Sequence, residues 1–413
     1  MRRFSQGGAI VVSAVILLAG CAAPQDALTP DGETTEPTQD LAAWGVDWTR
    51  IDVTPPSTAE AGYWRSLGGG DILWAYQTEL PTTLYGTTDG ATWLTVDLTE
   101  HGLPAEANFQ SDYSCPDTKI LGDDGPTALL HYVSGYGGTH PLGLLTAMWF
   151  VEVTSAGAVT VTNGADIGLE RMPASEAGWD FRTRCIAGTV DLAGTEIMVG
   201  GGQWWQPYKT GSYDLFSATR GADGSWSVYS TNSPPMNSAS GNHYIVGVER
   251  VGDEVMMVTL STGTATQFDV WRTTDGRSWE VERVDAITEG ELDLFTAQFA
   301  VTGDGMMAVL GSYSADGGDI VAVWSSADGS TWKRTDLTEA GYRKPLLVTE
   351  SPSGLFVLLE GDGGVDAWGT SDGAVWSQLA ENLPYAAGGA VPVAGGLASF
   401  AGSAILLTGL DWR

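Results

Sequence analysis

A nine-residue pattern occurs four times in this chain and constrains its fold more than any other feature. Each copy has an aromatic residue four positions before an Asp, Ser or Thr two positions before it, Gly directly after it and Trp four positions after it. The copies span residues 85–93, 271–279, 324–332 and 368–376, with a shortened copy at 222–226 and a degenerate one around 155–159. This regularity predicts that one structural unit is repeated along the chain.

Each copy joins strand-forming residues to a tight turn. In Ser/Thr-x-Asp-Gly, the short polar side chains can bond the turn backbone, and Gly accepts a positive φ. The Trp then begins the next strand. With 55 Gly, 17 Trp and 13 Tyr, the composition also suits many short strands connected by turns. We therefore predict an all-β fold and exclude a helical bundle.

The pattern resembles the Asp-box, or BNR, repeat of sialidase-like β-propellers, in which it closes the hairpin between the third and fourth strands of each blade. The resemblance covers residues 44–413. It implies that the repeated Asp and Trp residues are structural and that ligands bind on the opposite face. These structural residues are Asp89, Trp93, Asp223, Trp226, Asp275, Trp279, Asp328, Trp332, Asp372 and Trp376.

The spacing of the copies marks six blades, and the two ends of the domain imply a seventh. Residues 48–53 look like the strand that follows an Asp-box but have no preceding strands, whereas residues 390–413 supply strands without a fourth. We predict a seven-bladed β-propeller of four-stranded antiparallel blades, closed by the N-terminal strand. Closure of this kind leaves no exposed sheet edges.

The N-terminus predicts export and lipidation. Arg2 and Arg3 precede a short apolar run, and Leu18-Ala19-Gly20-Cys21 resembles the lipobox of bacterial lipoproteins. The resemblance implies that residues 1–20 are a signal peptide, and that palmitate or a similar lipid on Cys21 anchors the protein to the bacterial cell membrane, outside the cytoplasm. The alternatives are an ordinary secretory signal with an incidental cysteine and an uncleaved anchor.

Residues 21–43 differ in composition from the rest of the chain. After Cys21 they contain three Pro, several Thr, five acidic residues and no aromatic residue. This composition predicts an extended tether between the lipid and the propeller. Beyond it lie Cys115 and Cys185, which an oxidising compartment would join in one disulfide, the alternative being two unpaired thiols.

The net charge of −32 excludes a nucleic-acid partner, because phosphates would be repelled. The His residues show no metal-ligand spacing, so we expect neither a metal nor a cofactor; they are His101, His131, His140 and His243. No catalytic residue can be assigned from the sequence.

Candidate ligand-binding residues lie in two predicted turns and one connection on the face opposite the Asp-boxes. The turn at 134–141 holds Tyr136 and His140, and the turn at 202–209 holds Trp204, Trp205 and Tyr208. Exposed aromatic rings there can stack on sugars or anchor a protein partner. The alternative is that the Trp residues fill a gap between blades. A further candidate is Arg171, in an Arg-x-Pro element faintly similar to one that binds substrate in sialidases.

These observations predict a monomeric, non-catalytic binding or scaffold module for a glycan or an extracytoplasmic protein. One alternative is a sialidase-like exo-glycosidase; a second is an assembly factor for a membrane complex. The enzyme is the less expected reading, because the three converging arginines that sialidases need cannot be assigned here, and because a fold by itself does not confer an activity.

Overall fold

A computed structural model describes the residues that carry the sheets of this chain. The described residues are 44, 49–53, 64–66, 73–77, 80–87, 92–109, 127–134, 147–154, 156–168, 171–175, 179–206, 209–230, 242–262, 266–287, 297–315, 318–338, 344–361, 364–383, 390–393, 396–401 and 404–409. In several strands only the backbone is described, including 171–175, 179–185, 202–206 and 209–214. The chain divides into two compact units, Met1–Thr35 and Glu36–Arg413, and all described residues belong to the second. No described helix is long and apolar enough to cross a membrane.

The strands form seven antiparallel sheets, numbered 1–7 in chain order. Sheet 1 holds β2 (Trp64–Ser66), β3 (Leu73–Gln77), β4 (Leu80–Thr87) and β5 (Leu94–Asp97), followed by the 3-10 helix η1 (Leu98–His101). Sheet 2 holds β6 (Asn108–Phe109), β7 (Thr127–Ser134), β8 (Ala147–Thr154) and β9 (Val159–Asn163). Sheet 3 holds β10 (Arg171–Ser175), β11 (Trp179–Leu192), β12 (Thr195–Gln206), β13 (Lys209–Arg220) and β14 (Trp226–Ser230).

The remaining sheets follow the same order. Sheet 4 holds β15 (Asn242–Val251), β16 (Glu254–Thr262), β17 (Thr266–Thr273) and β18 (Glu280–Ile287). Sheet 5 holds β19 (Gln298–Val301), β20 (Met307–Ala315), β21 (Gly318–Ser326) and β22 (Lys333–Asp336). Sheet 6 holds β23 (Lys344–Ser351), β24 (Gly354–Gly361), β25 (Gly364–Thr370) and β26 (Ser377–Leu383). Sheet 7 combines β27 (Ala390–Val393), β28 (Gly396–Ala401) and β29 (Ala404–Gly409) with β1 (Thr49–Val53).

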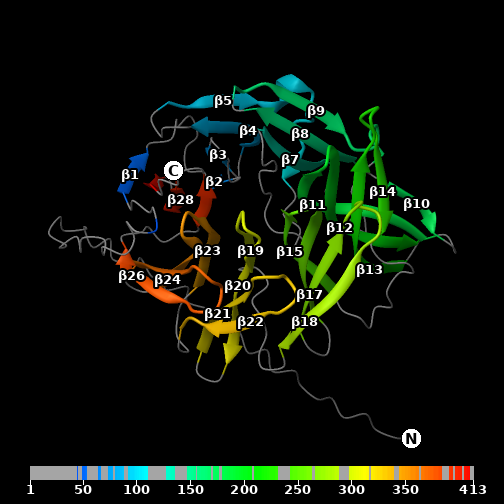
Figure 1. Ribbon diagram of the computed structural model, residues 1–413. Helices are drawn as coiled ribbons and strands as arrows, with labels where there is room; N and C mark the ends of the chain where they lie inside the picture. The colour runs from blue at the N-terminus through cyan, green and yellow to red at the C-terminus, as the bar shows by residue number, and fades with distance from the viewer. Residues whose placement is uncertain are drawn as a thin grey trace, which may run out of the picture. The chain divides into compact units, whose positions relative to one another are not determined.

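The prediction that the N-terminal strand completes the last sheet is confirmed. β1 pairs antiparallel with β29, from Thr49 opposite Gly409 to Val53 opposite Ile405, and Figure 1 shows β1 beside the C-terminal strands. The first and last parts of the described chain therefore hold each other in one sheet.

Each sheet packs against its neighbour in the chain. β15 contacts both β11 and β19, β19 contacts β23, and β23 contacts β27, so β11 of sheet 3 and the first strands of sheets 4 to 7 form the innermost layer. Sheets 2 and 3 share a cluster that includes Phe150, Met198 and Phe216. Sheet 7 packs against sheet 6 and, through β28 and β2, against sheet 1. This arrangement of antiparallel, mainly four-stranded blades is a β-propeller.

One blade departs from the predicted four strands. Sheet 3 has five, because β10 pairs with the beginning of β11 and extends the sheet by an extra strand. The repeat pattern could not reveal this strand, since residues 171–175 lie outside every copy of the motif.

The Asp-Gly turns adopt the predicted geometry wherever a full copy is described. In the turn after β17, the Oδ1 of Asp275 accepts hydrogen bonds from the backbone N–H groups of Arg277 at 2.7 Å and Ser278 at 2.9 Å. The hydroxyl of Thr273 accepts the N–H of Gly276 at 2.9 Å. Gly276 has a φ of +69°, and the equivalent Gly329 has +70°. The side chains thus bond the turn backbone, and glycine adopts the left-handed conformation, which is unfavourable for other residues.

These turns also join neighbouring sheets. The hydroxyl of Ser217 in sheet 3 donates to the carbonyl of Gly276 in sheet 4 at 2.6 Å. In the same way Arg272 donates to Gly329, and Ser325 donates to the carbonyl of Gly373. A Cβ on Gly276 would lie 2.9 Å from side-chain atoms of sheet 3. The repeated glycine therefore serves close packing between blades as well as the turn itself.

Candidate functional site

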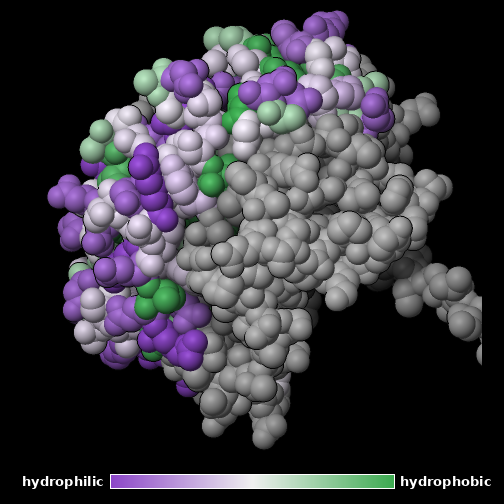
Figure 2. Space-filling model, turned by 90° about the vertical axis from the view of Figure 1, so that its right-hand side faces the viewer, coloured by the Kyte–Doolittle hydropathy of each residue, from purple (hydrophilic) through white to green (hydrophobic). Residues whose placement is uncertain are grey.

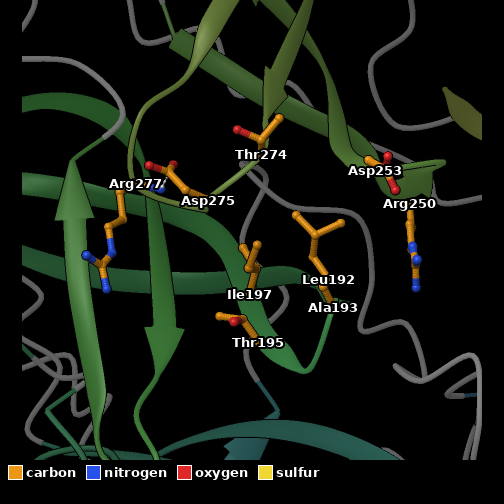
Figure 3. A pocket seen from close by; sticks show the side chains of 9 residues that line it. All are labelled: Leu192, Ala193, Thr195, Ile197, Arg250, Asp253, Thr274, Asp275 and Arg277. Carbon is orange, nitrogen blue, oxygen red and sulfur yellow. Dashed lines mark hydrogen bonds between the residues drawn. The ribbon is translucent and has the colours of Figure 1, made fainter.

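A surface hollow lies between sheets 3 and 4, on the side that carries the Asp-Gly turns. Its volume is about 440 Å³, and its lining residues are Leu192, Ala193, Thr195, Ile197, Arg250, Asp253, Thr274, Asp275 and Arg277. They come from the β11–β12 turn, the β15–β16 turn and the turn after β17. Figure 3 shows Leu192 and Ile197 between Arg277 on one side and Arg250 on the other.

The charged groups of this hollow are held by the turns that form it. Hydrogen bonds from the backbone of Ser278 and Arg277 and from the hydroxyl of Thr273 keep the pKa of Asp275 below its usual value. The Arg250 Nε donates to the carbonyl of Gly252 at 3.0 Å. The Arg250 Nη1 also donates to the carbonyl of Asp191 in sheet 3 at 3.4 Å, so this arginine links the two blades.

The second arginine is placed by an aromatic ring. The guanidinium of Arg277 lies 5.6 Å from the ring centroid of Tyr229 in sheet 3, a cation–π distance. With two arginines and two aspartates, the lining is electrically balanced. It holds no Ser, Cys, His or Lys, and its two hydroxyl groups belong to Thr195 and Thr274. This polar and charged lining suits a small polar molecule.

The opposite end of sheet 3 is built differently from the other blades. β11 has 14 residues, and β12 and β13 have 12 each, while the corresponding strands of sheet 6 have eight, eight and seven. These long strands are prominent in Figure 1. The ladder between β12 and β13 continues to the pair Gln206–Lys209. Because the Asp-Gly turns lie at the other end of β13, the extra length projects from the predicted ligand-binding side. We call this part, formed by residues 171–175, 179–182, 203–206 and 209–213, the sheet 3 extension.

The register of the sheet 3 extension places four polar residues in one row across four strands. Arg171 is opposite Arg182, Arg182 is opposite Gln203, and Gln203 is opposite Tyr213. Residues directly opposite one another in antiparallel strands occupy the same face of the sheet. We call these four residues the arginine row. Asp180, Trp205 and Thr210 form the next row of the same face. Asp180 and Trp205 lie two positions along their strands and Thr210 lies three, because the ladder between β12 and β13 shifts register there.

The sequence-predicted binding residues are placed unequally. Arg171 lies in β10, and Trp204 and Trp205 lie in β12 of the same extension. The register places Arg171 and Trp205 on one face of sheet 3, and Trp204 on the other. Tyr136, His140 and Tyr208 lie outside the described residues.

The prediction that Trp204 and Trp205 lie in a loop is wrong. Both belong to β12, where Trp204 is opposite Phe181 and Trp205 is opposite Asp180 and Thr210. Gly202 of this segment also lies within β12, and β13 begins at Lys209. The ladder therefore continues where the composition indicated a wide turn.

Other predicted sites lie outside what the structure describes. Cys21 and Cys115 are not among the described residues, and only the backbone of Cys185, in β11, is described. The lipid anchor and the disulfide remain predictions. In the first Asp-box, residues 88–91 lie outside the described residues, so the placement of Asp89 is not described, while that of Trp93 is.

Sequence reasoning missed Arg182, Gln203 and Tyr213. A signal was present: two runs at 195–206 and 209–220 separated by two residues predict a long hairpin. That hairpin would have placed Gln203 near Tyr213, although no sequence signal sets the register with β10. Within the described ranges, no cluster of three or more His, Cys, Asp or Glu residues could hold a metal ion.

No protein-family model and no curated protein match this chain. Among solved structures, a protein of unknown function from Dyadobacter fermentans has a TM-score of 0.47 and 12% identity, covering 89% of this chain and 100% of that chain. A polysaccharide lyase of family PL25, an ulvan lyase, has a TM-score of 0.43 and 10% identity, covering 82% and 81%. The β-propeller domain of the Trilobed protease from Pyrococcus furiosus has 0.41 and 7%, covering 78% and 86%. TM-scores this low carry no argument, so the fold assignment rests on the sheets themselves.

Proposed function

We propose that this protein is a lipid-anchored, extracytoplasmic binding or scaffold module, with a glycan or a protein as its ligand, and that its seven sheets are the blades of one closed propeller. The observation that supports this function is the sheet 3 extension. It lengthens one blade, on one side, at a place where a symmetric propeller has no structural need for extra strands. Binding elements carried on a rigid scaffold commonly take this form.

The composition of the extension supports binding rather than packing alone. Tryptophan, tyrosine and arginine are the residue types that dominate binding energy at interfaces. The extension carries all three, in Trp205, Tyr213 and Arg182, at neighbouring register positions on one face. Aromatic residues such as Trp205 and Tyr213 can stack on a sugar ring or fill a pocket of a protein partner.

Carboxyl chemistry in the described part of the chain supports a non-catalytic role. Backbone hydrogen bonds in the Asp-Gly turns hold the pKa of Asp328 at about 2 and lower the pKa of Asp372. A general acid at neutral pH needs the opposite shift. These carboxylates are turn residues, which the resemblance to Asp-boxes also implies.

The ligand experiment uses the full chain extracted in detergent, applied to a glycan array and to candidate extracytoplasmic proteins. The double variant Trp204→Ala/Trp205→Ala is compared with Trp226→Tyr. Trp226 lies at the opposite end of the same sheet, beside the Asp-Gly turn. We expect binding that the double variant loses and the control retains. Sugar trimmed on the array and detected by mass spectrometry would establish a glycosidase instead, and equal binding by both variants would remove the extension from the ligand site.

The anchor is tested separately. We expect a fatty acid carrying an alkyne tag to label the protein, and Cys21→Ser to abolish both the label and the sedimentation with membranes. Retention of the label in Cys21→Ser would contradict the proposed anchor without affecting the proposed binding site.

A further inference from the structure

The most unusual feature of the sheet 3 extension is that two arginines lie directly opposite each other. Arg171 of β10 and Arg182 of β11 are register partners. Like charges directly opposite in a sheet destabilise it. The chain has only 19 Lys and Arg against 51 Asp and Glu, so acidic partners were abundant for either position. A local conflict of this kind is expected at functional sites rather than at structural ones.

The pair belongs to a larger polar row. Gln203 and Tyr213 continue it across β12 and β13, and Trp205 lies in the adjacent row of the same face. Register irregularities occur between Met172 and Ser175, between Thr183 and Cys185, and between Gln203 and Trp205. Bulges concentrate at sheet edges and beside binding sites, where they redirect residues. The arginine row therefore lies in the most irregular part of the sheet.

β10 forms the edge of the extension among the described strands. β10 is the last strand of its sheet, and within the described elements its substantial contacts are with β11 alone. Pro173, in the middle of β10, has no N–H to donate, so the edge is unsuited to pairing with a further strand. A ligand would therefore meet the face of the extension, and charge complementarity would select it.

The size of the face limits what it can bind. Four strands about 4.8 Å apart and four residues deep, at about 3.3 Å each, make a surface on the order of 250 Å². A stable protein–protein interface needs about 800 Å² from each partner. A short peptide segment fits the smaller area, and the arginine pair calls for carboxylates on it.

We propose that the arginine row of the sheet 3 extension, placed by the opposition of Arg171 and Arg182, docks an acidic peptide segment of an extracytoplasmic partner protein. This inference rests on the proposed binding function and assigns its ligand class. The net charge of −32 opposes a long polyanion such as a nucleic acid, but a short segment meets mainly the charges close to the row, because charges more than about 8 Å away are largely screened at physiological ionic strength. On this face of the extension, the two arginines outnumber the single carboxylate of the adjacent row, Asp180.

The test compares two synthetic peptides on the full detergent-extracted chain, one of alternating Glu and Thr and one of alternating Gln and Thr. We expect the acidic peptide alone to bind. Arg171→Gln/Arg182→Gln should weaken binding about tenfold or more, the effect of losing charge-assisted hydrogen bonds. Arg334→Gln, on the exposed strand β22 of sheet 5, is the matched control and should bind normally. Circular dichroism checks that all variants remain folded.

Several results would overturn the assignment. They are equal binding of the two peptides, no binding of the acidic peptide up to about 1 mM, the same loss in Arg334→Gln, and binding of oligogalacturonate in place of the peptide. The last result, or any ligand lost with Trp204 and Trp205 but not with the arginines, would leave the proposed binding function intact and reject only the acidic peptide.

Discussion

The indole ring of Trp44 packs directly on the backbone of Gly369, near the end of β25 in sheet 6. Gly369 lies three residues before Asp372, the position that Arg272 and Ser325 hold before Asp275 and Asp328. Arg272 and Ser325 each bond the Asp-Gly turn of the following sheet. In sheet 7 the strands β29 and β1 come from opposite ends of the chain, so no turn joins them. Trp44 takes the place of the missing turn.

Gly369→Ala should therefore destabilise the closure between sheets 6 and 7. A Cβ at this position would lie 2.7 Å from Cη2 of Trp44 and 2.9 Å from Cδ1 of Leu379. We expect the free energy of unfolding to fall by about 1–3 kcal/mol, as measured by denaturant titration. In a double-mutant cycle with Trp44→Ala, part of this loss should disappear; strictly additive effects would show that the two residues are not coupled.

Ala193→Gly should stabilise the protein. Ala193 has a φ of +53° in the β11–β12 turn, a conformation that is unfavourable for a residue with a Cβ. Glycine should relieve it and raise the free energy of unfolding by about 1 kcal/mol. The neighbouring Gly194 has a φ of +83° with nothing within 4 Å of an added Cβ. Gly194→Ala is thus a matched control whose loss of stability comes from the backbone alone.

The Asp-Gly turns should make stability fall in acid. Turn hydrogen bonds hold the pKa of Asp328 at about 2 and keep those of Asp275 and Asp372 lowered in the folded state. Their stabilising contribution is complete above the unfolded pKa of about 4, and is lost as pH falls towards the folded values, since the unfolded chain then binds more protons. Denaturant titrations at several pH values check this. Asp328→Asn should reduce the slope between about pH 4 and pH 2; an unchanged slope would exclude Asp328 as a contributor.

Arg272→Ala should lower the free energy of unfolding more than the removal of an ordinary surface arginine does. The guanidinium of Arg272 donates to the carbonyl of Gly329 in the next sheet and lies 3.5 Å from Glu254. We expect a loss of about 1–3 kcal/mol, because the part-buried guanidinium loses its hydrogen bond across the two sheets and the Gly329 carbonyl keeps only the indole N–H of Trp332 as a donor. Arg334, exposed and 3.4 Å from Asp336, is the comparison, and Arg334→Ala should cost less than about 1 kcal/mol. Similar losses for the two variants would remove Arg272 from the contact between blades.

The described part of the surface shows no candidate for binding beyond the sheet 3 extension and the hollow between sheets 3 and 4. Its exposed large apolar residues, Leu80, Val281 and Val375, occur singly, and Figure 2 shows the described side of the molecule as largely hydrophilic with scattered apolar spots. Single apolar residues of this kind are normal on soluble proteins. The hollow between sheets 3 and 4 and the sheet 3 extension remain the two places with a distinct composition.

The sequence by itself determined the all-β class, the Asp-Gly turns and the pairing of the N-terminal strand with the last sheet. These features are local or repeated: Thr273, Asp275 and Gly276 bond within one turn, so the pattern of residue types is sufficient to predict them. The same locality explains the candidate residues that were found, since Trp204 and Arg171 belong to conspicuous short segments. Their strand placement was missed because composition alone cannot separate a wide loop from a tight hairpin.

The tertiary structure decided everything that depends on register or on packing between sheets. Arg171 faces Arg182 only because β10 pairs with β11 at one register, and a shift of one residue would place the arginine on the other face. Trp44 meets Gly369 across 325 positions of chain because the propeller closes there. Such contacts arise from the summed packing of distant segments, for which no local run of residues carries a signal.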